Sequence, residues 1–425
     1  MKKRPSATSP ALKEQSFLVG IKREFQDRGK ALESLRELEK LSVSAGAAVK
    51  GKALQELQRI DPALFIGRGK VQEIRETISS HDINLVVFDE DLSPAQQRNL
   101  ETILGAKVID RTALILDIFA QRAKSREGKL QVELAQLTYL LPRLRGKGLV
   151  LSRLGGGIGT RGPGETQLEV DRRKIRERIH RLNQDLKKVR NVRTIQRLGR
   201  RLSSPFLIAI VGYTNAGKST LLNCLTHAGV IVENRLFSTL DPTTRRLKLP
   251  SNQAVMISDT VGFINKLPHQ LIASFKATLE EINQADLLLH IIDISNPEAE
   301  RQIDSVNQVL EEIGAGNRPT IHVLNKIDVL DDPHAIRFWK RRLENGVAIS
   351  ALTGKGIKDL SRLTDSLLTK DMEKARFKLP VTAGRIISQI HANGMVTKKE
   401  YKGNEVIIEA KVTPRLAAAL SAYRM

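Results

Sequence analysis

The stretch FLIAIVGYTNAGKSTLLN (206–223) decides the fold, because an apolar strand, a glycine-containing turn and a helix follow one another without a break. Its centre, GYTNAGKS (212–219), has the spacing of a phosphate-binding loop. Phosphate oxygens need several backbone N–H groups that converge on one point, and glycines allow that close approach. We expect Lys218 to reach the β- and γ-phosphates and the Ser219 hydroxyl to bind Mg²⁺. The alternative is a glycine-containing turn that holds no ligand.

The residues downstream of this loop predict a doubly wound parallel sheet. Apolar runs at 254–258, 287–293, 320–325 and 346–350 are separated by helical stretches. Together with the strand at 206–212 they form one α/β domain.

The motif DTVG (259–262) follows an apolar run, as in nucleotide-switched proteins. We expect Asp259 to approach Mg²⁺ through a water molecule and the Gly262 N–H to contact the γ-phosphate. Alone, this motif is a common turn. Its weight comes from its position after the phosphate-binding loop.

Two later motifs predict that the base is guanine. In NKID (325–328), the Asp328 carboxylate can accept two hydrogen bonds, from guanine N1–H and from its exocyclic amine. Adenine cannot offer this pattern, and buried acceptors left unpaired are penalised. We expect Lys326 to pack its stem over the base and Asn325 to tie the loops together. A backbone N–H of SAL (350–352) would reach guanine O6.

A threonine must complete the Mg²⁺ shell when GTP is bound. The segment LFSTLDPTTRR (236–246) offers Thr239, which we choose, with Thr243 and Thr244 as alternatives. We expect this segment to become ordered with the γ-phosphate and to be released after hydrolysis. The predicted nucleotide site as a whole comprises Gly212, Tyr213, Thr214, Asn215, Ala216, Gly217, Lys218, Ser219, Thr220, Phe237, Ser238, Thr239, Leu240, Asp241, Asp259, Thr260, Val261, Gly262, Asn325, Lys326, Ile327, Asp328, Ser350, Ala351 and Leu352.

Length and composition indicate a soluble chain with several domains. At roughly 100 to 200 residues per domain, 425 residues allow two to four domains. Hydrophobic residues make up 41% and charged residues 27%, which excludes wholesale disorder. One cysteine, Cys224, cannot form an internal disulfide, and no apolar stretch is long enough to span a membrane. We therefore expect a cytoplasmic protein, and a monomer.

The net charge of +22 is concentrated in one part of the chain. Residues 122–201 hold 22 basic and 7 acidic residues, a density that favours binding to phosphate backbones through counterion release. A solvated helical face is the alternative. Aromatic residues are only 4% of the chain, which argues against stacking on single strands. We expect structured RNA or DNA as the partner.

The basic region predicts two antiparallel helices, at 132–144 and from 165 onward, around a glycine-rich loop at 155–164. Apolar residues repeat in the second helix at heptad spacing, at Ile175, Ile179, Leu182, Leu186 and Val189. We call residues 122–203 the basic arm. The residues that we expect to contact phosphates are Arg153, Arg161, Arg172, Arg173 and Lys174.

The pattern outside the basic arm and the nucleotide domain predicts two smaller domains. Strands at 17–21 and 84–92 alternate with a helix at 31–41 and with the stretch 63–78, which predicts a strand end and then a helix. This alternation indicates a small parallel sheet. A helix, a strand and a helix at 383–393, 405–412 and 414–422 indicate an α+β ending that leans on the nucleotide domain. The predicted division is a disordered tail (1–15), an N-terminal α/β domain (16–121), the basic arm (122–203), the nucleotide domain (204–370) and a C-terminal domain (371–425).

The motifs resemble the HflX family of ribosome-associated GTPases. The similarity rests on GYTNAGKSTLLN, FSTLDPTTR, DTVGFI and above all GGGIGTRGPGETQLEVDRRKIRERI (155–179), and covers about residues 15 to 370. The resemblance implies a GTPase that the large ribosomal subunit activates and that splits stalled or stress-inactivated ribosomes into subunits. In this interpretation the GTP form docks the basic arm into ribosomal RNA, the N-terminal domain acts as a wedge, and hydrolysis serves release.

One residue departs from the pattern of simpler GTPases. Phe263 follows DTVG where many relatives carry a glutamine that orients the attacking water. We therefore expect no direct side-chain base, charge stabilisation by Lys218, and slow hydrolysis that the ribosome stimulates. Asn215 is similar to an asparagine that helps to bind K⁺ in some related GTPases, which leaves K⁺ open as a second ion beside Mg²⁺.

Weaker motifs have ordinary interpretations. GRGK (67–70) can hold a phosphate, and some relatives bind ATP in this region, but an RNA contact or a plain helix start is favoured. For the acidic run 89–91 we favour a solvated strand end with a helix cap over a metal site. The histidines show no zinc-ligand spacing, and we interpret Cys224 as a core residue.

Two rival functions remain open. A nucleotide-switched assembly factor for the large subunit would carry the same motifs. An ATP-dependent RNA-binding or unwinding module, run from the N-terminal domain, would depend on the GRGK motif (67–70).

Overall fold

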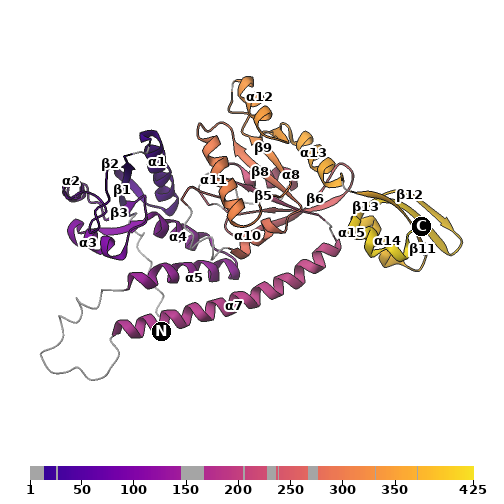
Figure 1. Cartoon of the computed structure of the whole chain (residues 1–425), viewed down its shortest axis with the longest axis horizontal. Coiled ribbons are helices and arrows are strands. Elements are labelled where there is room, and N and C mark those ends of the chain that lie inside the picture. Colours follow the sequence, from indigo (N-terminus) through magenta and orange to yellow (C-terminus); the bar gives the residue numbers. More distant parts are fainter. Residues whose placement is uncertain are drawn as a thin grey trace, which may run out of the picture. The chain divides into compact units, whose positions relative to one another are not determined.

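A computed structural model describes residues 14–24, 27–144, 167–203, 206–226, 236–237, 239–266, 276–330, 332–370 and 372–425. These residues form two compact units, one up to Asp185 and one from Leu186 onward (Figure 1). The predictions for Ser238, Arg153, Arg161 and the loop 155–164 lie outside the described residues. No helix in the described ranges is long and apolar enough to cross a membrane.

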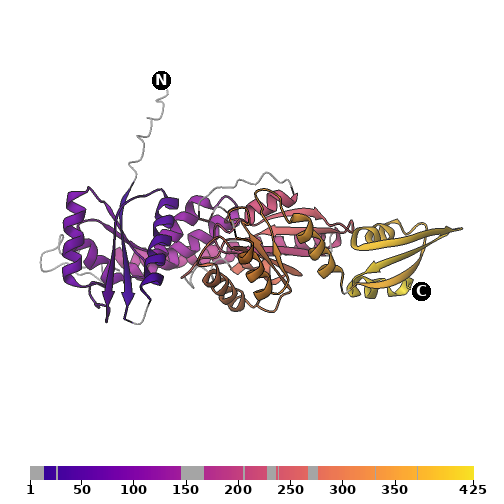
Figure 2. The same ribbon diagram turned by 90° about the horizontal axis from the view of Figure 1, so that it is seen from above.

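The first unit contains a four-stranded parallel sheet of order β2-β1-β3-β4, with helices on both faces (Figure 2). The strands are β1 (Gln15–Arg23), β2 (Ala48–Leu57), β3 (Leu85–Phe88) and β4 (Lys107–Asp110), and the helices are α1 (Arg28–Ala45), α2 (Arg68–Ser80), α3 (Pro94–Leu104) and α4 (Arg111–Arg122). Helices α2 and α3 cover one face, and α1 packs with α4 on the other. Ser93 begins α3 with a capping box that includes Gln96.

Two expectations for this sheet are wrong. Leu64–Ile66 form no strand end; they are buried side chains of a turn before α2, held by an isolated pairing of Asp61 with Phe65. Asp89 is not solvated either, because it is 4% exposed and accepts hydrogen bonds from Arg111 Nη1 at 2.7 Å and Ser34 Oγ at 2.5 Å. Arg111 is 2% exposed and also pairs with Glu37, so the carboxyl edge of β3 is closed by a buried ion-pair network.

The basic arm consists of α5 (Arg126–Arg143) and α7 (Gln167–Ser203). Helix α5 and the first half of α7 lie side by side and run in opposite directions (Figure 1), joined by a bidentate pair between Arg178 and Glu133 at 2.7 and 2.9 Å. Leu182 and Leu186 of the heptad seam are buried. The antiparallel helical arm that the sequence predicts is therefore present.

The end of α5 is fastened to the N-terminal sheet. Asp110, at the end of β4, accepts from Tyr139 Oη at 2.7 Å and from Arg143 Nη2 at 2.9 Å. The Arg143 guanidinium also lies 3.4 Å from the centre of the Tyr139 ring. Burial raises the pKa of Asp110, against the opposing effects of its hydrogen bonds and of Arg143.

The second unit contains a six-stranded sheet of order β10-β9-β8-β5-β7-β6, parallel except for β6. The strands are β5 (Leu207–Gly212), β6 (Thr243–Lys248), β7 (Ala254–Asp259), β8 (Leu287–Asp293), β9 (Thr320–Asn325) and β10 (Gly346–Ala348). Helices α8 (Lys218–Thr226) and α13 (Ile357–Thr369) contribute to the core on one face, and α11 (Ala299–Glu312) and α12 (Pro333–Arg342) to the core on the other, while α10 (Lys276–Asn283) packs beside β5. The predicted doubly wound sheet is confirmed, with β6 as an added antiparallel edge.

The same unit ends in a three-stranded antiparallel sheet of order β11-β13-β12. Its elements are β11 (Glu373–Pro380), α14 (Gly384–Asn393), β12 (Gly394–Lys402), β13 (Glu405–Val412) and α15 (Pro414–Ala419). The two helices lie on one face of this sheet (Figures 1 and 2) and form an apolar core with it. The sequence did not predict β11 and β12, and the ending has an apolar core of its own.

Candidate nucleotide site

The phosphate-binding loop links β5 to α8 and depends on two glycines. Gly212 has φ 148°, and a Cβ there would lie 2.4 Å from the Ile291 carbonyl oxygen. Gly217 has φ 102°, and its Cβ would lie 2.2 Å from Asn325 Nδ2. Any side chain at either position would displace backbone or break a contact, so the sequence signal here is a packing requirement.

Lys218 turns its ammonium group back into the loop. Its Nζ donates to the carbonyl oxygens of Gly212 at 3.1 Å and Tyr213 at 2.6 Å. Burial lowers the pKa of Lys218 to about 8, although the nearby Asp259 carboxylate opposes this shift. A buried ammonium group so close to the loop is well placed to be neutralised by phosphate oxygens.

Three hydroxyl and carboxylate groups meet beside Lys218. Ser219 Oγ donates to Asp259 Oδ2 at 2.7 Å and lies 2.9 Å from Thr239 Oγ1. Asp259 is 0% exposed, and its Oδ1 has no hydrogen-bond partner among the described residues. Burial raises the pKa of Asp259, while Lys218 and the hydroxyls of Ser219 and Thr239 lower it. Hard oxygen donors with a spare carboxylate oxygen fit Mg²⁺.

The two alternative threonines lie on a strand and not beside the Ser219 hydroxyl. Thr243 and Thr244 belong to β6, where Thr243 is paired opposite Asp259 across the sheet. Thr244 Oγ1 lies 3.3 Å from Ser258 Oγ. The structure thus brings Thr239, and not these two residues, to the Ser219 hydroxyl; its role as a metal ligand stays a prediction.

The DTVG motif is attached to the phosphate-binding loop through the residue that follows it. Phe263 N donates to Gly212 O at 3.1 Å, and its carbonyl oxygen accepts from Thr214 N at 2.7 Å. The Phe263 side chain is 1% exposed, so it lies in the core and cannot orient a water molecule. A Cβ on Gly262 would come within 2.9 Å of Lys218 Nζ. Two backbone hydrogen bonds therefore join the motif to the loop.

Asn325 ties the predicted base-binding loops to the phosphate-binding loop. Its Nδ2 donates to Ala216 O at 2.8 Å, and its Oδ1 accepts from Ala351 N at 3.0 Å. Lys326 has φ 67° and pairs with Asp293 at 2.6 Å. Asp328 is exposed, and its carboxylate has no partner in the described part of the chain. This leaves Asp328 accessible to a ligand.

The remaining predicted residues divide into two groups. A small cavity is lined by Thr214, Asn215, Gly217, Lys218, Ser219, Thr220, Phe237, Thr239, Thr260 and Gly262. The residues Tyr213, Ala216, Leu240, Val261, Ile327, Ser350 and Ala351 are buried supports around it, Asp241 is half-buried, and Leu352 is 80% exposed. Cys224 of α8 is partly buried and burial raises its thiol pKa, which agrees with a packing role.

A contact of Tyr213 and a buried histidine near this cavity were not predicted from the sequence. The Tyr213 hydroxyl accepts a hydrogen bond from Asn265 N at 2.7 Å, a second link between the loop and the segment after DTVG. His290 is buried in β8, opposite Val211, and burial lowers its pKa to about 3. It is therefore neutral beneath the loop. No spacing rule predicts these contacts, because they depend on which strands are neighbours.

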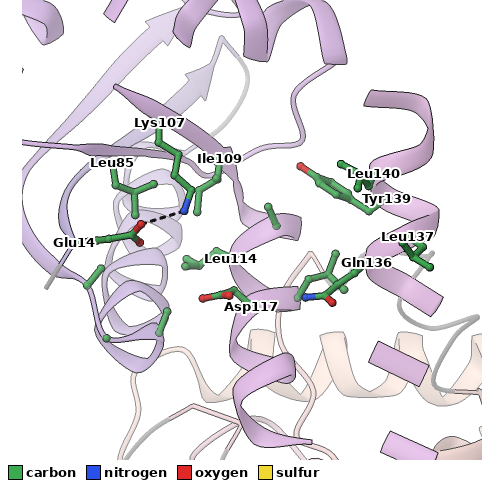
Figure 3. A pocket seen from close by; sticks show the side chains of 15 residues that line it. Glu14, Leu85, Lys107, Ile109, Leu114, Asp117, Gln136, Leu137, Tyr139 and Leu140 are labelled. Atoms are coloured by element: carbon green, nitrogen blue, oxygen red, sulfur yellow. Dashed lines mark hydrogen bonds and ion pairs between the residues drawn. The ribbon is translucent and has the colours of Figure 1, made fainter. Parts of the chain in front are cut away.

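The first unit holds a larger cavity of about 590 Å³ between α4, α5 and the start of β3 and β4 (Figure 3). Leu85, Leu114 and Leu140 line it, and an ion pair of Glu14 with Lys107 at 3.1 Å stands at its edge. It lies at the amino end of the parallel strands, whereas α/β sheets bind ligands at the carboxyl end.

The GRGK motif is occupied by internal contacts. Gly67 N donates to Gln55 Oε1 at 3.1 Å, and Lys70 pairs with Glu73 at 2.6 Å. Gly67 N and the Lys70 side chain therefore have partners within the N-terminal domain. This geometry is that of a plain start of α2.

Comparison with known proteins identifies the family. Three family models match consecutive stretches: "GTP-binding GTPase N-terminal" over 32–120, "GTP-binding GTPase Middle Region" over 122–200 and "50S ribosome-binding GTPase" over 207–326. The chain is 46% identical over 401 residues to GTPase HflX of Caldanaerobacter subterraneus, covering 94% of this chain and 91% of that one. The chain belongs to the HflX family of GTPases. It is also 45% identical over 388 residues to GTPase HflX of Escherichia coli, with coverage of 91% and 90%.

A solved structure is also similar to this HflX-family chain. A GTP-binding protein from Sulfolobus solfataricus in complex with GDP matches at 25% identity and a TM-score of 0.44, covering 84% of this chain and 99% of that one. Membership of the family makes this chain a GTP-binding P-loop protein and a GTP hydrolase.

The exposed Asp328 carboxylate predicts a change of base specificity. In Asp328→Asn, the side-chain amide donates where the carboxylate accepts, so it pairs with the C2 carbonyl of xanthine rather than the guanine amine. We expect Kd for GDP to rise by at least about a hundredfold and the variant to prefer XDP. Fluorescence titration with labelled GDP and XDP checks this, with Asp332→Asn as the control. An unchanged preference for GDP would contradict the assignment of Asp328.

The cluster of Ser219, Thr239 and Asp259 predicts which threonine contributes to Mg²⁺-dependent nucleotide binding. Thr239→Ala removes a hydroxyl beside Ser219, so we expect it to weaken the Mg²⁺ dependence of binding a non-hydrolysable GTP analogue, with GDP affinity changed less than about threefold. Thr244→Ala, a control on β6, should leave both unchanged. Isothermal titration at several Mg²⁺ concentrations measures this. Loss of Mg²⁺ dependence in Thr244→Ala alone would contradict the choice of Thr239.

Proposed function

We propose that this GTPase binds the large ribosomal subunit in its GTP form and splits stalled or stressed ribosomes into subunits. GTP hydrolysis then releases it. The observation that carries the proposal is the joining of a GTP site to the basic arm, where 122–201 hold 22 basic and 7 acidic residues. A region this basic fits a partner with a phosphate backbone, such as ribosomal RNA. Ribosomes are cytoplasmic, so the proposal places the protein in the cytoplasm.

The basic arm supplies the RNA contacts in this proposal. Arg173 and Lys174 of α7 are exposed, and Arg172 is half-buried. The arm is also fastened to the N-terminal sheet through Asp110, Tyr139 and Arg143. We infer that docking of the arm carries the N-terminal domain with it as a wedge between the subunits.

The metal requirement follows from the oxygen cluster. The hydroxyls of Ser219 and Thr239 would hold Mg²⁺ directly and Asp259 through water, and the ion would neutralise charge on the β- and γ-phosphates when bound. Asn215 is exposed at φ 62° in the phosphate-binding loop, and K⁺ is a second ion that this position would serve.

Hydrolysis needs help from outside the chain in this proposal. The Phe263 side chain is buried, and Lys218 provides charge stabilisation without any proton transfer. We infer that a group supplied by the ribosome, or a rearrangement on it, orients the attacking water. GTP turnover is then coupled to docking.

A splitting assay with an arm variant tests the proposal. Intact ribosomes are incubated with the protein and a non-hydrolysable GTP analogue, then separated on sucrose gradients. We expect subunits to appear with the analogue and not with GDP. The triple variant Arg172→Gln, Arg173→Gln and Lys174→Gln should lose splitting, and its salt slope for binding should fall by about 2 to 3. Nucleotide affinity should be unchanged.

The matched control removes the same charge elsewhere. Lys248, Lys358 and Lys370 are exposed lysines of the GTPase domain, and their replacement by glutamine should leave splitting intact. Splitting that survives in the arm variant would exclude the arm as the anchor. Binding to large subunits without any splitting would instead favour the assembly-factor alternative.

A further inference from the structure

The C-terminal domain is a second basic part of the chain. Residues 372–425 contain ten lysines and arginines and four acidic residues, whereas residues 204–371 contain 18 and 19. The GTPase domain is therefore nearly neutral, and the positive charge of the second half is concentrated after it. The resemblance to relatives gives this ending no role.

Strand register places most of this charge on one face of the sheet. The side chains of Ala375, Phe377 and Leu379 in β11 point into the core, so the alternate residues of that strand point away from α14 and α15. The pairing of β11, β13 and β12 puts six cations on this outer face: Lys374, Arg376, Lys378, Lys398, Lys402 and Lys411.

The acidic residues on the outer face all form ion pairs with cations of the same face. Arg376 pairs with Glu409 at 3.4 Å, Lys378 with Glu405 at 2.9 Å, and Lys398 with Glu400 at 2.6 Å. These three acids are Glu400, Glu405 and Glu409. Lys374, Lys402 and Lys411 form no ion pair with any described residue, so three positive charges remain in excess.

Two of the excess lysines face each other directly. Lys374 in β11 and Lys411 in β13 are cross-strand partners in the antiparallel register. Like charges at directly opposed positions destabilise a sheet, and neither lysine forms an ion pair with a described residue. An anionic ligand seated over the pair would turn this repulsion into attraction.

We propose that the outer face of the C-terminal sheet binds the phosphate backbone of ribosomal RNA, through Lys374 and Lys411 at one end and Lys402 at the other. The two ends lie six positions apart along β13, from Lys411 to Glu405, the partner of Lys402, which is roughly 20 Å at the rise of a strand. This span covers several consecutive phosphates. The proposal rests on the proposed function only in its choice of ribosomal RNA.

The chemistry of the face favours RNA over a membrane surface. The apolar residues of β12 and β13 on the outer face are Ile407, which is 8% exposed, and Met395, which is half-buried opposite Lys411, so the face presents mainly charge. Membrane-surface elements add apolar side chains to their cations. Lysine ammonium groups without a shaped pocket are typical of contacts to phosphate backbones, which position a protein without reading sequence.

The experiment uses the full chain and a triple variant, Lys374→Gln, Lys402→Gln and Lys411→Gln. The matched control is Lys248→Gln, Lys358→Gln and Lys370→Gln, which removes the same charge. Binding is measured over a salt series to two probes: purified large ribosomal subunits with a GTP analogue, and protein-free large-subunit ribosomal RNA. We expect the C-terminal variant to lose about tenfold in affinity for both, with a salt slope smaller by about 2 to 3.

Folding is checked separately. The variant relieves the repulsion between Lys374 and Lys411, so its Tm should be at or above that of the wild type, and its GDP affinity should be unchanged. Equal behaviour of the C-terminal variant and the matched control would overturn the proposal. So would a loss confined to intact subunits, because that result assigns the face to an acidic ribosomal protein. If the wild type fails to bind subunits but binds RNA through this face, the proposed function fails and this inference stands.

Discussion

The Asn325 side chain is the contact on which the nucleotide site depends. It joins the Ala216 carbonyl of the phosphate-binding loop to the Ala351 amide of the SAL loop, so three strand ends are held by one amide group. Gly217 lies so close to this amide that a Cβ would reach it at 2.2 Å. The phosphate-binding loop and the SAL loop are therefore joined within the chain itself, and such preorganisation reduces the cost of binding a ligand.

The phosphate-binding loop is also joined to the segment after DTVG. The backbone of Phe263 bonds to Gly212 and Thr214, and the Tyr213 hydroxyl accepts from Asn265, so the segment after DTVG follows the phosphate-binding loop. With the Phe263 ring in the core, the residue after DTVG brings no side chain to activate water. The proposed function therefore assigns the activation of water to a group supplied by the partner.

The sequence predicts the centre of the sheets better than their edges. Strands β8 and β9 match the apolar runs 287–293 and 320–325 because they are buried on both faces. Strands β2, β6, β11 and β12 were missed, since their exposed residues break the apolar pattern with lysine, arginine, glutamate and glutamine. Strand β4 was missed because it has only four residues. The site motifs could be predicted because the glycine spacing of the phosphate-binding loop and the residues of NKID lie within short stretches of sequence. The buried Asp89–Arg111 pair and the choice among three threonines depend on tertiary contacts, which periodicity does not contain.

Charge separates the chain into a nearly neutral GTPase domain between two basic parts, the basic arm and the C-terminal domain. In the proposed function, nucleotide chemistry and RNA binding belong to different parts of the molecule, and hydrolysis is slow until the RNA partner is engaged. The most direct measurement is the rate of GTP turnover by the purified protein with and without large ribosomal subunits. We predict slow turnover by the protein alone and strong stimulation by the subunits. Fast turnover by the protein alone, unaffected by large subunits, would contradict this coupling.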